Sequence, residues 1–210
     1  MLDGVEVLCH SSIRILKDKI IYIDPFRIKE NYNDADYIFI THEHYDHFSP
    51  EDINKVRKDS SIIIVPESMF EKALETKFKP ENIKTVIPNT RYCINDFVFD
   101  TVYAYNIDKN FHPKKNNWVG YILLINNISY YIAGDTDITE DNININCDVA
   151  FVPVGGKYTM TYKEAAKLIN NIKPKVAIPT HYGEIVGDKK DGNKFANLLE
   201  DSIKFKILIG

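Results

Sequence analysis

The stretch Thr41-His42-Glu43-His44-Tyr45-Asp46-His47-Phe48 decides how this chain is interpreted, because it places three histidines and two carboxylates within six positions. These are half of the six histidines in the chain, and they directly follow an apolar run. Imidazole and carboxylate groups are donors that Zn, Mn and Fe accept, and a turn leaving a strand lets neighbouring side chains converge. The stretch therefore predicts a metal site. Because Asp46 stands four positions after His42, the helix-borne H-E-x-x-H arrangement of metalloproteases is excluded.

The composition predicts the kind of protein that carries this site. With 210 residues, 44% of them hydrophobic, we expect one well-buried domain spanning residues 1–210. A net charge of −4 argues against a nucleic-acid partner, and no apolar run approaches the roughly 20 residues of a membrane span. The start Met1-Leu2-Asp3-Gly4 lacks the pattern of a secretory signal, and the three cysteines suit reduced thiols, so we expect a cytoplasmic protein. A homo-oligomer remains open.

Hydrophobic periodicity predicts a mixed α/β chain. The first third is expected to form a strand meander of Val5–Cys9, Ile13–Leu16, Ile20–Asp24 and Tyr37–Thr41. A helix is expected to begin at Ser49, and further helices at Glu67–Thr76, Tyr162–Asn171 and Lys190–Leu199. Further strands are expected at Ser61–Val65, Lys84–Ile87, Phe97–Tyr105, Trp118–Ile125, Ile128–Ala133, Val149–Val152, Lys175–Ile178 and Phe205–Ile209. This order predicts sheets packed face to face with helices on their outer sides.

Several motifs resemble the metallo-β-lactamase superfamily, whose signature H-x-H-x-D-H is matched in full by the first stretch. The chain looks most like the branch of metal-dependent hydrolases related to ascorbate 6-phosphate lactonase and, more distantly, to N-acyl phosphatidylethanolamine phospholipase D. The other matching motifs are Cys9-His10-Ser11-Ser12, Ile23-Asp24-Pro25-Phe26, Gly134-Asp135-Thr136-Asp137, Val152-Pro153-Val154-Gly155-Gly156 and Pro179-Thr180-His181-Tyr182-Gly183. The resemblance implies a four-layer αββα sandwich of the α/β (α+β) class.

The resemblance also implies a set of metal ligands. His42 and His44 would bind one metal, and Asp135 would bridge it to a second metal bound by Asp46, His47 and His181. Asp135 and His181 both follow predicted strands, where a side chain can leave the sheet. We expect two divalent ions, with Zn first and Mn or Fe as alternatives, and a one-metal site as the other outcome.

The third histidine of the first metal does not transfer cleanly. Many members of the superfamily place it soon after a strand like Thr101–Tyr105, where this chain has Asn106. His112 lies six residues later. Either His112 reaches back as the ligand, or Asn106 marks a depleted site completed by water. We favour His112, since neutral imidazole is the commonest protein metal ligand.

Other residues near these motifs are candidates for supporting roles. Asp24, after an apolar strand, is expected to orient a ligating imidazole through its second nitrogen, as Asn106 would if it does not ligate. His10 either contacts substrate or is structural. Lys115, with Lys109 and Lys114, either meets an anionic substrate or is simply solvated. Gly156 and Tyr158 are expected at the rim of the site, where backbone amides could face a substrate oxygen or serve only the turn.

The arrangement predicts a hydrolase that uses a metal-activated hydroxide, with Asp46 and Asp135 as catalytic residues. Two divalent cations, two aspartates and a hydroxide leave a charge of about +1, which favours a small anionic lactone, ester or phosphodiester. One alternative is a mononuclear iron oxidoreductase on the same scaffold. Another is a non-catalytic metal-binding module, which an open, carboxylate-bridged site disfavours.

Overall fold

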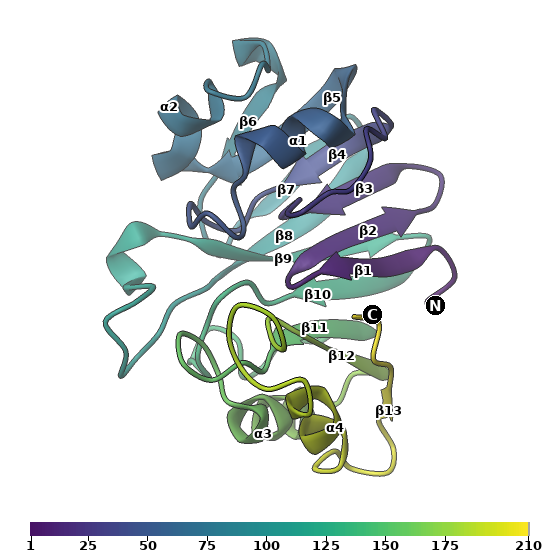
Figure 1. Ribbon diagram of the computed structural model, residues 1–210, viewed down its shortest axis with the longest axis vertical. Helices are drawn as coiled ribbons and strands as arrows, with labels where there is room; N and C mark the ends of the chain where they lie inside the picture. Colours follow the sequence, from purple (N-terminus) through teal and green to yellow (C-terminus); the bar gives the residue numbers. More distant parts are fainter. Residues whose placement is uncertain (210) are drawn as a thin grey trace. The chain divides into compact units, whose positions relative to one another are not determined.

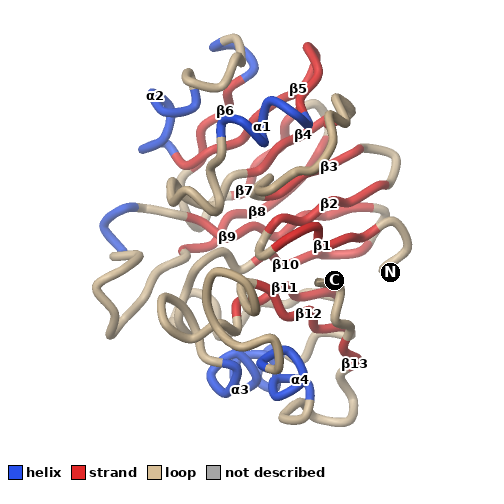
Figure 2. The backbone as a smooth tube through the Cα atoms, in the orientation of Figure 1, coloured by secondary structure: helices blue, strands red, loops and turns tan. Residues whose placement is uncertain are grey.

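The computed structural model describes residues 1–209 and divides into two compact units, each built on its own β-sheet (Figure 1). The N-terminal unit comprises residues 2–87 with Ile209, and the C-terminal unit comprises residues 88–208 with Met1. Most regular structure is strand, and long loops connect the strands (Figure 2). The prediction of a mixed α/β chain with two sheets is confirmed.

The N-terminal unit has a six-stranded sheet in the sequential order β1 to β6. Its strands are β1 (Val5–Cys9), β2 (Ser12–Leu16), β3 (Ile20–Ile23), β4 (Ala35–Phe39), β5 (Arg57–Pro66) and β6 (Ile83–Val86). The predicted meander holds for β1 to β3, which pair antiparallel, but β4 pairs parallel to β3. The long connection of residues 24–34 permits this, because parallel strands need a crossover and not a tight turn.

The metal motif lies in a loop held at both ends. It follows β4 and precedes helix α1 (Pro50–Val56), which begins where the sequence predicts. The Ser49 side chain accepts a hydrogen bond from the Asp52 backbone N–H, and proline occupies the first turn. Ile53 and Val56 of α1 are fully buried in the core with sheet residues such as Ile38. This packing fixes where the loop emerges.

The C-terminal unit has a seven-stranded sheet in the order β13-β12-β11-β10-β9-β8-β7. Its strands are β7 (Arg91–Ile94), β8 (Phe97–Tyr103), β9 (Val119–Ile125), β10 (Ile128–Ile132), β11 (Val149–Pro153), β12 (Val176–Thr180) and β13 (Lys204–Phe205). Strands β7 to β10 pair antiparallel, and β10 to β13 pair parallel. The remaining elements are helices α3 (Tyr162–Ile172) and α4 (Asp191–Ala196) and the 3-10 turn η3 (Lys114–Asn116).

Three element predictions are wrong in detail, and one strand was not predicted. Glu67–Thr76 forms the 3-10 turn η1 (Glu67–Met69) and the short helix α2 (Phe70–Ala73), and neither start has a side-chain cap. Lys190–Leu199 shortens to α4, which also lacks a capping side chain. Phe205–Ile209 shrinks to the exposed edge strand β13, and strand β7 was missed. A further 3-10 turn, η2 (Pro80–Asn82), precedes β6.

Two of the three cysteines lie in the interior of the protein. Cys9 and Cys147 are buried, Cys93 is exposed, and no disulfide joins them. Burial raises the pKa of the Cys147 thiol to about 12, so it stays protonated at neutral pH. Among residues 1–209 there is no helix with the length and apolar character needed to cross a membrane.

Asp148 ties together the starts of three strands in the C-terminal unit. Its carboxylate accepts from the backbone N–H and hydroxyl of Ser129 at 2.9 Å each, and its other oxygen lies 2.7 Å from Lys175 Nζ. The Val176 N–H donates to the Asp148 carbonyl. The hydrogen bond from Lys175, then that from the Ser129 backbone, lowers the pKa of Asp148 to about 2. The strand ends that carry the site residues lie at the other end of this sheet.

Asp148→Asn is expected to destabilise the protein by about 1 kcal/mol at pH 7, a figure reduced because the Lys175 partner is exposed. The folded pKa lies below the unfolded value, so this stabilisation is present above about pH 4 and is lost as the pH falls towards 2. Urea unfolding of both proteins at pH 7 and pH 2.5 measures it. The exposed Asp201→Asn is the control, and a difference as large at pH 2.5 as at pH 7 would contradict the assignment.

Candidate metal centre

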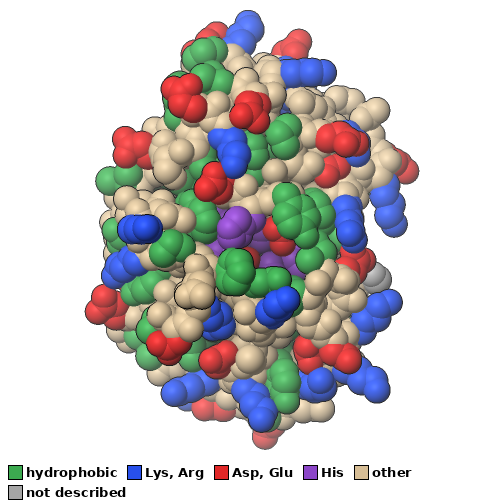
Figure 3. All heavy atoms as spheres, turned by 60° about the vertical axis from the view of Figure 1, so that its left-hand side comes forward, with side chains coloured by type: hydrophobic (Ala, Val, Ile, Leu, Met, Phe, Trp, Pro, Cys, Tyr) green, Lys and Arg blue, Asp and Glu red, His purple; other side chains and the backbone are tan. Residues whose placement is uncertain are grey.

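His42 and His44 form the first part of a histidine and aspartate cluster in the N-terminal unit. His42 Nε2 lies 3.1 Å from His44 Nδ1, with the two rings edge to face. His42 is buried and His44 is half-buried. Histidine side chains reach the surface on one face of the molecule (Figure 3). The pair is thus able to direct two ring nitrogens at one point that solvent can reach.

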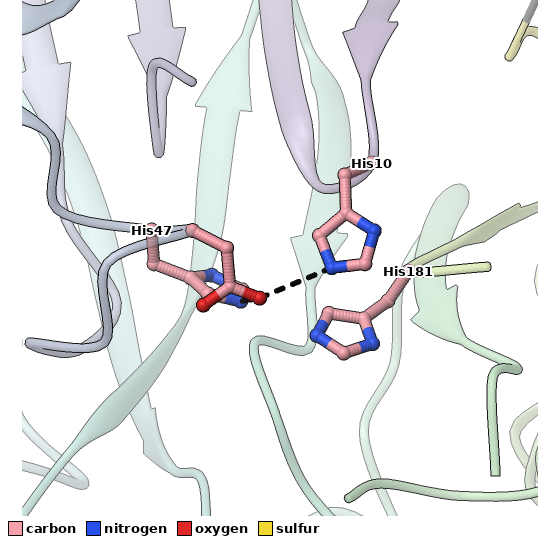
Figure 4. Close-up of side chains that lie close together, drawn as sticks. His10, His47 and His181 are labelled. Carbon is pink, nitrogen blue, oxygen red and sulfur yellow. Dashed lines mark hydrogen bonds and ion pairs between the residues drawn. The ribbon is translucent and has the colours of Figure 1, made fainter. Parts of the chain in front are cut away.

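Asp46, His47 and His10 form the second part of this cluster. Each offers a ligand atom, and these atoms lie within 4.8 Å of one another. Asp46 Oδ2 is 3.2 Å from His10 Nε2, the contact drawn as a dashed line in Figure 4, and 3.8 Å from His47 Nε2. His10 leaves the end of β1 and is completely buried. Its contact with Asp46 gives it a defined place beside the metal motif.

Asp24 lies behind His47 and orients the ring. Its Oδ2 is 2.7 Å from His47 Nδ1 and accepts from the Thr41 hydroxyl, and its Oδ1 accepts from the Thr41 backbone N–H at 2.8 Å. Burial raises the pKa of Asp24 above the usual carboxyl range, and the interactions with His47 and Thr41 oppose that rise. With Nδ1 engaged by Asp24, the Nε2 side of His47 is the one available to a cation.

Asp24→Asn is expected to weaken metal binding about 10- to 100-fold. The amide keeps one acceptor oxygen but sets an N–H₂ group against either His47 or Thr41, so the imidazole loses its fixed orientation. Competition with a coloured chelator measures the metal dissociation constant.

Asp52→Asn is the matched control, since Asp52 is also a buried carboxylate in this unit that accepts from the Arg27 and Ile28 backbone N–H groups. It should lower stability and leave metal affinity unchanged. Equal losses of affinity in both variants would show that Asp24 acts only through the fold.

The C-terminal unit carries a second cluster, centred on Asp135. Asp135 Oδ2 lies 3.2 Å from His112 Nε2 and 3.1 Å from His181 Nε2, and all three side chains are buried. Asp135 follows β10. His181, labelled in Figure 4, directly follows β12. His112 comes from the loop after β8. Two imidazoles therefore converge on one carboxylate oxygen.

Asn106 lies on the far side of the His112 ring. Its Nδ2 is 3.1 Å from His112 Nδ1, and it donates to the carbonyls of Phe111 at 3.0 Å and Tyr158 at 2.7 Å. His112 Nε2, not Asn106, is the group that faces Asp135. His112 as the third ligand stays a prediction.

The residues expected at the rim of the site differ in the contacts they make. The Gly156 N–H donates to the Met160 carbonyl at 3.0 Å, so the turn itself uses that amide. Tyr158 is held beside His112 through Asn106. Lys115 is exposed on η3, and its neighbour Lys114 pairs with acidic side chains. The structure gives Lys115 no contact with the clusters.

Four residues of the two clusters and their supports have left-handed backbone, which nothing in the sequence indicated. The φ angles are 53° for His10, 46° for Asp24, 58° for His112 and 58° for His181. Such a conformation costs a non-glycine residue roughly 1–2 kcal/mol and is typical of functional sites. Gly155 accommodates one of them closely, because a Cβ there would lie 2.2 Å from the His181 carbonyl oxygen.

The donors present fit divalent transition metals. Imidazole nitrogens and carboxylate oxygens are the ligands that Zn, Mn and Fe accept, and neither cluster contains thiolates. The Nδ1 atom of His47 faces the Asp24 carboxylate, which leaves Nε2 outward, as is usual for metal-binding histidines. A two-sheet α/β fold with such clusters after its strands defines the class as a metallo-β-lactamase-type metalloprotein.

Comparison with known proteins agrees with this class. Residues 5–181 match the model of the beta-lactamase superfamily domain, and the chain belongs to this superfamily. It is 30% identical to a UPF0173 metal-dependent hydrolase of Pyrococcus horikoshii, over 97% of this chain and 95% of that protein. A crystal structure of a metal-dependent hydrolase from Parabacteroides distasonis is 30% identical with a TM-score of 0.83, covering 97% and 91%. The metallo hydrolase Igni18 from Ignicoccus hospitalis shares the fold at 20% identity and a TM-score of 0.77, covering 98% and 94%.

Proposed function

We propose that the protein is a metal-dependent hydrolase whose two clusters bind two divalent cations jointly. The observation that carries the proposal is that each unit gathers buried histidine nitrogens and aspartate oxygens in a cluster of its own. The superfamily match includes the residues of both clusters, and two relatives are named as metal-dependent hydrolases.

In this proposal the first cation would be held by His42, His44 and His112, and the second by Asp46, His47 and His181. Asp135 would be shared by the two cations, a role supported by the approach of His112 Nε2 and His181 Nε2 to its Oδ2. Zinc is the first choice of metal, with manganese or iron as alternatives.

The bound cations would lower the pKa of a shared water towards about 7 and polarise the substrate oxygen. The protein side chains would position the water and take up its proton. Asp46 would orient the attacking water and accept its proton, and His10, whose Nε2 lies 3.2 Å from Asp46 Oδ2, would support Asp46. Asp24 keeps the His47 ring in place.

The proposed substrate is a small anionic lactone, ester or phosphodiester. A centre with a net charge of about +1 attracts anions, whereas the whole chain, at −4, is poorly suited to nucleic acid. Three cysteines without a disulfide suit a cytoplasmic location.

Hydrolysis of a panel of lactones, carboxylic esters and phosphodiesters tests the proposal. Protein stripped with dipicolinate should lose turnover, and added zinc or manganese should restore it. Metal content determined by mass spectrometry on the same samples should rise to about two ions per chain. Full turnover in metal-free protein, or no turnover of any class at full occupancy, would overturn the proposal.

A further inference from the structure

An aromatic pair, exposed at Phe111 and half-buried at Tyr158, lies in the C-terminal unit beside the Asp135 cluster. Phe111 is 47% exposed, and its ring packs edge to face against Tyr158 with centroids 4.7 Å apart. Ile107, in the same loop, is 60% exposed. Large exposed apolar groups gathered in one place often mark a binding site.

The pair is built into the fold by one buried side chain. Asn106 is 6% exposed and donates from the same amide nitrogen to the carbonyls of Phe111 and Tyr158. The two residues come from different loops, after β8 and after β11. One buried amide thus fixes both backbones, so the rings are presented at low entropic cost to a ligand.

The position of the pair beside the Asp135 cluster suggests that it contacts the substrate. Phe111 immediately precedes His112, whose Nε2 is 3.2 Å from Asp135. Lys157 Nζ lies 5.0 Å from the Tyr158 ring centroid, which adds a positive charge at the pair. An apolar surface bordered by a cation suits a molecule with an apolar group and an anionic head.

We propose that Phe111 and Tyr158 form an aromatic wall that binds an aryl group of the substrate next to its anionic, hydrolysable head. This inference rests on the proposed hydrolase function and names its substrate class. An aryl group is favoured because aromatic rings prefer edge-to-face or offset contacts with the two rings present. Phe111 is therefore a specificity-determining residue.

Binding of two phosphonates to the zinc-loaded protein tests the wall without any turnover. Phenylphosphonate and methylphosphonate share the anionic head and differ only in the aryl group. The chain has a single tryptophan, and the Trp118 ring lies 5.6 Å from the His112 ring, so its fluorescence reports on ligands here. We expect phenylphosphonate to bind about tenfold more tightly.

Three variants, each checked for folding by circular dichroism, assign that preference. Phe111→Ala should abolish it, and Phe111→Leu should retain part of it. Leu124→Ala, which removes an equally exposed side chain (44%) from β9, should leave it unchanged. Equal binding of the two phosphonates by the unmodified protein, or a preference that survives Phe111→Ala, would overturn the inference.

Turnover of a lactone pair separates this inference from the proposed function. The probes are 2-methyl- and 2-phenyl-5-oxotetrahydrofuran-2-carboxylate, two anionic lactones that differ in a methyl or phenyl substituent. A lower KM for the phenyl lactone that disappears in Phe111→Ala supports both proposals. Turnover of both lactones with equal KM would end the aryl inference and leave the hydrolase standing. Aryl-selective phosphonate binding, with no turnover across the whole panel, would leave the wall standing and end the hydrolase.

Discussion

Asp135→Asn is expected to lower kcat/KM for any substrate the protein hydrolyses by on the order of 10³-fold or more. The carboxylate is 3% exposed, and its Oδ2 lies within 3.2 Å of the Nε2 atoms of both His112 and His181. An amide removes the negative charge and replaces one of two oxygens with an N–H₂ group, so the side chain can no longer bridge two cations. Steady-state kinetics and metal content per chain measure the effect.

Asp141→Asn is the control for Asp135→Asn. Asp141 is a hydrogen-bonded carboxylate a few residues further along the chain, and it accepts from Asn89, Tyr105 and Lys114. It should keep its metal and stay within a few-fold of the unmodified rate. If Asp135→Asn retained full metal content and full turnover, the bridging role would be wrong.

Asp46→Asn is expected to reduce kcat by about 10²- to 10⁴-fold, with a smaller change in KM, because the amide cannot accept the proton of the attacking water. The His42 and His44 pair is untouched, so at least one cation should remain bound. The measurement is kcat and KM at saturating zinc, together with the number of ions retained.

His10→Gln gives the comparison for Asp46→Asn. Glutamine can still donate a hydrogen bond towards Asp46 Oδ2, which lies 3.2 Å from His10 Nε2. Its loss of kcat should be at least tenfold smaller than that of Asp46→Asn. Equal losses would mean that His10 takes part in the chemistry directly and that Asp46 is not the proton acceptor.

Local signals in the sequence predicted the local structure well. Ser49 and Pro50 marked the start of α1, and Thr161 with Glu164 forms a capping box at the start of α3. Such signals involve residues three apart, so a linear reading contains them in full. The region of Glu67–Thr76 had helical periodicity but no capping side chain, and there the regular helix was lost.

Strand β7 shows a signal that was present but overlooked. Asn95 and Asp96 separate it from β8 and have φ angles of 47° and 65°. Two consecutive residues with positive φ are typical of the tight turn of a two-residue hairpin, and Asn and Asp tolerate that conformation. Strand β13 is different, because only two exposed residues pair at the edge of the sheet and no periodicity can reveal them.

Residue types and their spacing were sufficient to predict the metal motif of the candidate site, but not the backbone that positions its other residues. Three histidines and an aspartate within one turn predict a metal site. No pattern in the sequence predicts the left-handed backbone of His112 and His181. The contact of Asn106 with two carbonyls depends on loops that are 52 residues apart in sequence. Tertiary packing decides such features, so the sequence alone does not predict them.

The most direct test of the central claim is a crystal structure of the zinc-loaded protein with data collected on both sides of the zinc absorption edge. We expect two anomalous peaks, with His42, His44 and His112 around one, and with Asp46, His47 and His181 around the other. Asp135 should reach both ions, at Zn–O distances of about 2.0–2.2 Å. Peaks bound only by residues of the His42 to His47 loop, with Asp135 and His181 turned away, would contradict the account.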